Sequence, residues 1–182
     1  MAGSTPGWHL NEHGKQQTEK LVKRLEKVPI RAVYTSPLER AIETAGPLAK
    51  SLGLVLQRVE ELGEIRLGEW EGLAIGELEQ RDDWRRFNTF RSGVRPPGGE
   101  LMAETQVRMI QQLECLRTRH VRETVAVVSH ADPLRAALAW YLGIPLDLIL
   151  RLEVATASIS IVQLHDWGVR VLGINDTGEV AA

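Results

Sequence analysis

The 182-residue chain has little cysteine, no long apolar run and almost no excess of charge, and each absence excludes a class of protein. Its single cysteine, Cys115, excludes an internal disulfide and a cysteine-rich zinc site, and its place in a helical pattern predicts a packed thiol. No apolar run approaches the roughly 18–20 residues of a membrane span, and we expect no signal peptide. The formal charge of −2 gives no general attraction to nucleic acid or to an anionic membrane. We therefore expect a cytoplasmic, soluble protein.

The composition, 43% hydrophobic and 25% charged, is that of an ordinary globular protein, and we expect one domain over residues 1–182. Helical and strand patterns alternate along the chain, which predicts an α/β fold with a largely parallel sheet. In the helix expected at 100–120, the inward residues are predicted to be Val107, Ile110, Leu113 and Leu116. The other expected helices lie at 12–27, 36–51 and 81–90, and the strands at 32–35, 54–61, 124–128, 157–165 and 169–174.

The most informative segment begins with Thr-Val-Ala-Val-Val at 124–128, which is typical of a fully buried strand. Ser129 and His130 follow at once, and Asp132 and Pro133 then predict the cap and first position of a helix. His130 is therefore expected where a strand ends and a helix begins. In open α/β sheets that edge binds ligands, and a helix N-terminus there suits a phosphate.

A second strand–helix junction is expected to place Arg40 near the same edge. The Ser-Pro-Leu-Glu run at 36–39 has the pattern of a capping box, so Arg40 is predicted as the fourth residue of a helix. The rigid guanidinium fork of arginine matches phosphate oxygens. The alternative is a surface arginine paired with Glu39 or Glu43.

The turn-rich loop at 62–72 offers three candidate acids, Glu64, Glu69 and Glu71. Glycines at 63, 68 and 72 let its backbone turn tightly. Of the three glutamates, Glu64 precedes the apolar Ile65, a neighbour that favours a raised pKa. The alternative is a solvated acidic loop.

Together these segments resemble, in order, the histidine phosphatase superfamily, also called phosphoglycerate-mutase-like. The resemblance implies a three-layer α/β/α sandwich around a mostly parallel sheet, and a reaction that needs no metal and no cofactor. The segments that carry it are HLNEHGKQQTEKL at 9–21, SPLERAIETA at 36–45, GEIRLGEWEG at 63–72, PPGGE at 96–100, VVSHADPLRAALA at 127–139 and ASISIVQL at 157–164.

The resemblance also implies a mechanism. In this family one histidine attacks the phosphoryl group and becomes phosphohistidine, while a second histidine and arginines hold the phosphoryl oxygens and a glutamate serves the leaving alcohol as acid. By position, His130 is the second histidine, Arg40 the clamping arginine and Glu64 the acid and base. Further substrate contacts are implied for Gly3, Ser4, Ala131, Arg85 and Arg86.

The arginines at 85 and 86 belong to a basic segment, residues 81–95, where the family places a variable lid over its substrate. They either recognise an anionic substrate or form a solvated basic helix. An RNA-binding role is less favoured because the chain as a whole is acidic.

The family's nucleophile lies in an Arg-His-Gly motif that ends the first, central strand. None of the five histidines here stands between an arginine and a glycine, although His13 precedes Gly14 and His9 lies nearby. We therefore expect that this chain lacks the nucleophile and the strand that carries it. The strands on either side would then face each other across a gap.

The sequence thus predicts a phosphomonoesterase that acts on a small phosphorylated metabolite and holds inorganic phosphate, with mutase activity less favoured and a homodimer left open. The alternative on the same fold is a phosphate-binding pseudoenzyme or interaction protein. A serine hydrolase using Ser129, His130 and Asp132 is disfavoured, because sequence neighbours rarely converge as a triad and no G-x-S-x-G elbow is present.

Overall fold

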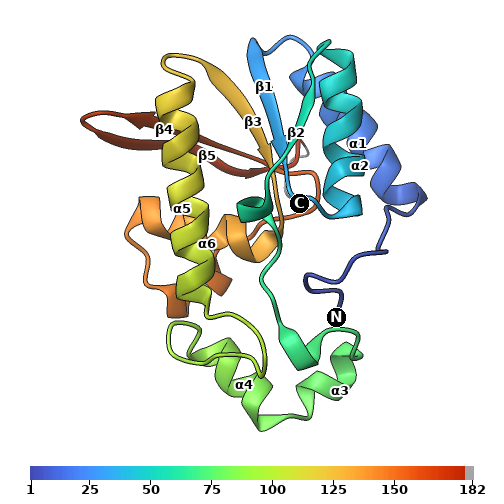
Figure 1. Ribbon diagram of the computed structural model, residues 1–182, viewed down its shortest axis with the longest axis vertical. Helices are drawn as coiled ribbons and strands as arrows, with labels where there is room; N and C mark the ends of the chain where they lie inside the picture. The colour runs from blue at the N-terminus through green and yellow to red at the C-terminus, as the bar shows by residue number, and fades with distance from the viewer. Residues whose placement is uncertain (179–182) are drawn as a thin grey trace.

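Three parallel strands form the main sheet of the computed structural model, which describes residues 1–178 (Figure 1). Strand β1 (Ile30–Thr35) lies in the middle, between β2 (Leu56–Arg58) and β3 (Thr124–Val128). Residues 179–182, the end of the expected single domain, lie outside the described residues. The largely parallel sheet predicted from the sequence is confirmed.

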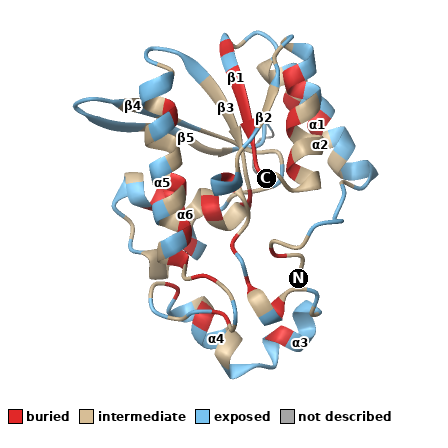
Figure 2. Ribbon diagram, viewed as in Figure 1, coloured by how far each residue is buried: buried red, intermediate tan, exposed pale blue. Residues whose placement is uncertain are grey.

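Helices pack on both faces of this sheet and give three layers. On one face, α1 and α2 bury Val33, Leu48 and their neighbours in one apolar cluster. On the other, α5 and α6 bury Tyr34, Met109 and Leu116 in a second cluster. Figure 2 shows the buried positions of β1, α2 and α5. The six α-helices of residues 1–178 are α1 (Glu12–Leu25), α2 (Glu39–Ser51), α3 (Ile75–Glu79), α4 (Asp82–Thr89), α5 (Met102–Arg119) and α6 (Ala131–Leu142).

A third apolar cluster lies at the far end of the molecule, below the sheet in Figure 1, where α3 and α4 fold over the loop at 62–72. Its centre is aromatic: the ring of Trp70 lies 5.3 Å from that of Trp84 and 5.4 Å from that of Phe87, both edge to face. Such pairs add about 0.5–1.5 kcal/mol each beyond the area they bury. The same cluster includes Ala136 and Ala139 of α6 and Ile149, so the segment predicted as a lid shares its core with the rest of the molecule.

The last two strands form a separate antiparallel hairpin, β4 (Ile159–His165) with β5 (Gly168–Asp176). Within residues 1–178, β3 pairs only with β1 and β4 only with β5, so the second edge of β3 has no partner strand. The prediction that β3 is fully buried is wrong: Thr124 is exposed and the rest of the strand is partly exposed. A strand covered along one edge alone stays open to solvent along the other.

Two predicted helix starts are also wrong. Helix α2 begins at Glu39 with Leu38 as its N-cap, two residues later than the capping box predicts. Helix α6 begins at Ala131, and its N-cap is His130 rather than Asp132. The side chains expected to cap these helices also have long-range partners: the Ser36 hydroxyl contacts His130 while it accepts from the Leu38 N–H at 3.3 Å, and Asp132 pairs with Arg91.

Two predictions on α5 fail because its buried stripe runs through other residues. Val107 is 54% exposed, and Cys115 is exposed rather than packed. The fully buried apolar residues, Met102, Met109 and Leu116, recur every seven positions. Among the described residues, no helix combines the length and apolar character needed to cross a membrane.

Candidate active site

His130 lies at the carboxyl edge of the sheet, where β3 ends and α6 begins. Its ring is buried, 7% exposed, and its Nε2 atom is 2.7 Å from the Oγ atom of Ser36, which follows β1. Burial, reinforced by the nearby charges of Arg40 and Arg108, lowers the pKa of His130 to about 3. The unliganded ring is therefore neutral at physiological pH.

Arg40, the second residue of α2, points its guanidinium into the same region. Its Nη2 donates to the carbonyl oxygen of Gly3 at 2.7 Å, whereas its Nη1 is buried and has no hydrogen-bond partner. Burial lowers the pKa of Arg40, opposed chiefly by the carboxyl of Glu64. A buried N–H group without an acceptor is costly, and a phosphoryl oxygen would satisfy it.

Glu64 has the ionisation expected of an acid that works near neutral pH. Burial raises the pKa of Glu64 to about 8, and the negative charge of Asp132 adds to the effect. Other contacts act to lower the pKa of Glu64, among them the Ile65 N–H, which donates to Oε1 of Glu64 at 3.0 Å, and the charge of Arg40. The carboxyl is thus largely protonated at pH 7 and can give up a proton.

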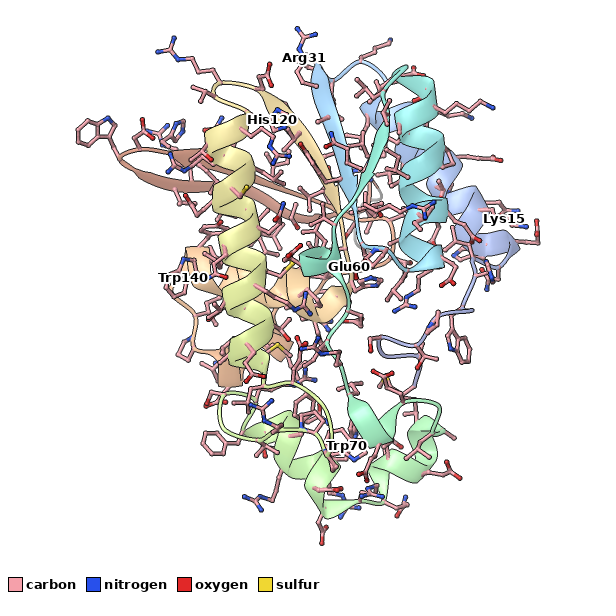
Figure 3. The ribbon with its side chains drawn as sticks, viewed as in Figure 1. Lys15, Arg31, Glu60, Trp70, His120 and Trp140 are labelled. Carbon is pink, nitrogen blue, oxygen red and sulfur yellow. The ribbon has the colours of Figure 1, made fainter. Side chains whose placement is uncertain are left out.

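The structure brings these three predicted residues into one region, because the charge of Arg40 affects the pKa of both His130 and Glu64. Glu64 also lines a cavity of about 310 Å³ beside them. Glu60, one of the residues that line the cavity, is labelled in Figure 3 and lies between α5 and the lower ends of the strands. The cavity is lined by Ser4, Pro37, Leu38, Glu60, Glu61, Gly63, Glu64, Arg66, Glu100 and Arg108.

Sequence reasoning missed Arg108, which fixes the backbone of the Glu64 loop. Its guanidinium donates to the carbonyl oxygens of Glu61 at 2.6 Å, Gly63 at 2.8 Å and Glu64 at 3.2 Å. It also pairs with the buried carboxylate of Glu100 at 2.9 Å. The available signal was Glu100 itself, an acid in the PPGGE segment that needs a cationic partner once it is buried.

The other predicted contacts divide into two groups. Gly3, Ser4 and Ala131 lie at the site: Gly3 accepts from Arg40, Ser4 lines the cavity and Ala131 follows His130. The lid arginines Arg85 and Arg86 are exposed on α4 and are not among the cavity's lining residues.

The buried arginine of the lid segment is Arg91, 4% exposed, which pairs with Asp132 at 2.6 Å. Asp132 also contacts Arg135 at 3.3 Å. The lid is therefore joined by an ion pair to the first turn of α6, directly after His130.

The contacts of Ser129 and Asp132 do not form a hydrolase triad. The hydroxyl of Ser129 donates to the carbonyl oxygen of Leu62 at 2.8 Å, and the Asp132 carboxylate is taken up by arginines. Neither therefore orients or activates the other through His130.

A profile of the histidine phosphatase superfamily, branch 1, matches residues 2–177. The chain belongs to this superfamily. Among the most similar curated relatives of this histidine phosphatase is phosphoserine phosphatase 1 of Hydrogenobacter thermophilus, 32% identical over 170 residues, 92% of this chain and 81% of the relative. The chain spans 47% of the mycobacterial proteins that it also matches.

Solved structures agree with the fold of this histidine phosphatase. The protein YhfR of Bacillus stearothermophilus superposes with a TM-score of 0.91 at 31% identity, over 97% of this chain and 88% of that one. A phosphoserine phosphatase of Entamoeba histolytica, solved with phosphoserine, superposes with a TM-score of 0.87 at 22% identity, over 97% of this chain and 88% of that one. This is a likeness of fold alone. By its family the chain is a histidine-type phosphatase.

Proposed function

We propose that this histidine phosphatase hydrolyses phosphomonoesters of a small metabolite through a phosphohistidine intermediate. The observation that carries the proposal is the buried, unpartnered Nη1 of Arg40, close to a neutral His130 and a protonated Glu64. Positive charge and N–H donors around the equatorial oxygens are what phosphoryl transfer requires. The name of one relative, phosphoserine phosphatase 1, supports a small phosphorylated substrate.

The proposed reaction has two steps. A histidine nitrogen attacks phosphorus, the phosphorus–oxygen bond to the alcohol breaks, and Glu64 gives its proton to the departing oxygen. Water then attacks phosphorus, Glu64 takes the proton from that water, and the phosphorus–nitrogen bond breaks to release inorganic phosphate. In both steps Arg40 and His130 donate hydrogen bonds to the phosphoryl oxygens, and the approach of the dianion favours protonation of His130.

The nucleophile is proposed to be a histidine that is not among these 182 residues, in a strand that pairs with the open edge of β3. Two observations support this: no histidine here follows an arginine and precedes a glycine, and within residues 1–178 β3 pairs with β1 alone. The same observations favour a second candidate, a phosphate-binding pseudoenzyme. A cytoplasmic location, with no nucleic-acid or membrane partner, is part of the proposal and is supported by the near-neutral charge.

A paired assay tests the proposal. Hydrolysis of p-nitrophenyl phosphate is measured for this chain and for a version extended upstream by a strand that ends in Arg-His-Gly, each with and without His130→Ala. Activity of the extended form alone, lost in its His130→Ala variant, is the expected result. Full activity of the present chain that survives His130→Ala would overturn the mechanism. Phosphate binding without turnover by either form would instead establish the pseudoenzyme.

A further inference from the structure

The carboxylate of Glu71 accepts four hydrogen bonds, and three of them come from one short segment at the start of the chain. Its Oε1 accepts from the backbone N–H of Ser4 at 3.0 Å, from the Ser4 hydroxyl at 2.7 Å and from the Leu67 N–H at 2.9 Å. Its Oε2 accepts from the Thr5 hydroxyl at 2.8 Å. Glu71 therefore ties residues 3–5 to the loop that carries Glu64.

The ionisation of Glu71 is opposite to that of Glu64, although the two lie in the same loop. Burial acts to raise the pKa of Glu71, but the hydrogen bonds from Ser4, Leu67 and Thr5 outweigh it and hold the pKa below its ordinary value. Glu71 stays ionised at neutral pH, and both of its carboxylate oxygens accept hydrogen bonds. It is thus suited to hold donors in place and unsuited to give up a proton.

Gly3 connects this carboxylate to Arg40. Its backbone is left-handed, with φ +51°, and a Cβ atom built there would lie 2.7 Å from Cγ of Glu71. Its carbonyl oxygen accepts from Nη2 of Arg40. Only glycine fits a position that combines this φ with such a close approach.

We propose that Glu71 is a positioning residue: by clamping residues 3–5 it sets the Gly3 carbonyl, which orients the guanidinium of Arg40 so that its Nη1 stays available to a phosphoryl oxygen. This inference rests on the proposed function, because the oxygen it serves belongs to the phosphate. It assigns Glu71 no contact with substrate.

The first test compares Glu71→Ala, Glu71→Gln and the control Glu69→Gln, a change of an exposed glutamate in the same loop. Each is titrated with inorganic phosphate by ³¹P NMR, and amide exchange is followed at Ser4 and Leu67. We expect Glu71→Ala to speed the amide exchange of both Ser4 and Leu67 and to weaken phosphate binding about tenfold. We expect Glu71→Gln to stay within about threefold, because an amide oxygen replaces Oε1 as the acceptor of three hydrogen bonds.

The rescue by glutamine distinguishes a clamp from an acid. An amide accepts hydrogen bonds but transfers no proton, so an equal loss in Glu71→Gln and Glu71→Ala would overturn the positioning role. Faster exchange with unchanged phosphate affinity would overturn it as well. If the unsubstituted chain binds no phosphate, the proposed function fails, and that result is recognised before any substitution is made.

A second pair of variants acts on the other side of the contact and does not depend on Glu71→Ala folding. Gly3→Ala and Gly7→Ala both place a side chain on a left-handed backbone, but only Gly3 lies against Glu71, and a Cβ at Gly7 meets nothing within 4 Å. We expect phosphate binding to weaken in Gly3→Ala by about tenfold and to be unchanged in Gly7→Ala. Equal effects in the two variants would overturn the proposal.

Discussion

The Nε2 atom of His130 lies 2.7 Å from the Oγ atom of Ser36, and this contact joins the carboxyl ends of β3 and β1. Both side chains are buried. The hydroxyl holds the Nε2 side of the imidazole, which leaves Nδ1 as the ring nitrogen without a described partner. Ser36 therefore acts on the site through His130, and the same oxygen accepts from the Leu38 N–H at 3.3 Å before α2 begins.

Removing this hydroxyl tests its role. In Ser36→Ala the Nε2 atom of His130 loses its partner, which we expect to lower the free energy of unfolding by about 1–2 kcal/mol and to weaken phosphate binding several-fold. Urea denaturation and ³¹P titration measure the two effects. Ser51→Ala, at the exposed end of α2, is the control, and equal changes in both variants would contradict the assignment.

Arg40 is expected to supply much of the affinity for phosphate. Arg40→Ala removes a half-buried cation whose buried Nη1 has no hydrogen-bond partner, so phosphate binding should fall about tenfold or more while the fold is retained. Arg31→Ala is the matched control, because Arg31 is exposed at the far end of β1 from Thr35, as Figure 3 shows. Calorimetric titration with phosphate measures both, and an equal loss in Arg31→Ala would indicate unspecific charge attraction.

Glu64 should make stability fall as the pH rises. The pKa of Glu64 is about 8 in the folded protein, and its ordinary value is 4.5. Between these two pH values the folded state therefore binds more protons than the unfolded state. Stability from this group is complete below pH 4.5 and is lost as the pH rises through 8, with a slope of up to about 1.4 kcal/mol per pH unit. The lowered pKa of His130 has the opposite sign but acts only below its ordinary 6.5.

The window from pH 7 to pH 9 therefore isolates Glu64. In urea denaturation we expect the unsubstituted chain to lose stability across this window and Glu64→Gln to lose much less. Glu61→Gln, an exposed neighbour, should follow the unsubstituted chain. Parallel profiles for the unsubstituted chain and Glu64→Gln would show that Glu64 ionises normally.

The ion pair between Arg91 and Asp132 should dominate the attachment of the lid. Arg91→Ala leaves the Asp132 carboxylate with Arg135 alone, and we expect the free energy of unfolding to fall by about 2–4 kcal/mol. Arg95→Ala breaks an exposed pair with Glu104 and should cost less than about 1 kcal/mol. Denaturant titration compares them, and equal losses would mean that the buried pair contributes no more than the exposed one.

The sequence was sufficient to predict the order of elements and the meeting of Arg40 and His130, because parallel strands end at one edge of a sheet. Glu64 was placed with them by the family resemblance. The sequence misplaced the helix starts, since local capping rules cannot register a long-range partner. Ser36 is engaged by His130, 94 positions away, and Asp132 by Arg91, 41 positions away.

Burial was harder to predict than element type. The run at 124–128 indicates a buried strand, but its exposure depends on whether a strand pairs with each edge, which its own residues do not encode. In α5 the pattern is apolar around several faces, so the sequence predicts both Val107 and Leu116 as inward residues. Only Leu116 packs in the cluster that includes α6, and Val107 is exposed. Arg108 looked like an ordinary charged helix residue until its carbonyl partners were known.

The aromatic centre of the lid has a spectroscopic consequence. Of the five tryptophans, Trp70 and Trp84 belong to the cluster under α3 and α4, whereas Trp8, Trp140 and Trp167 are exposed. The two apolar clusters that flank the sheet contain none among the described residues. A red shift in the fluorescence of Trp70 and Trp84 therefore reports the opening of the cluster under α3 and α4. Circular dichroism, which is dominated by the helices, follows the whole chain. A difference between the two transition midpoints would reveal whether the lid melts as a unit separate from the sheet.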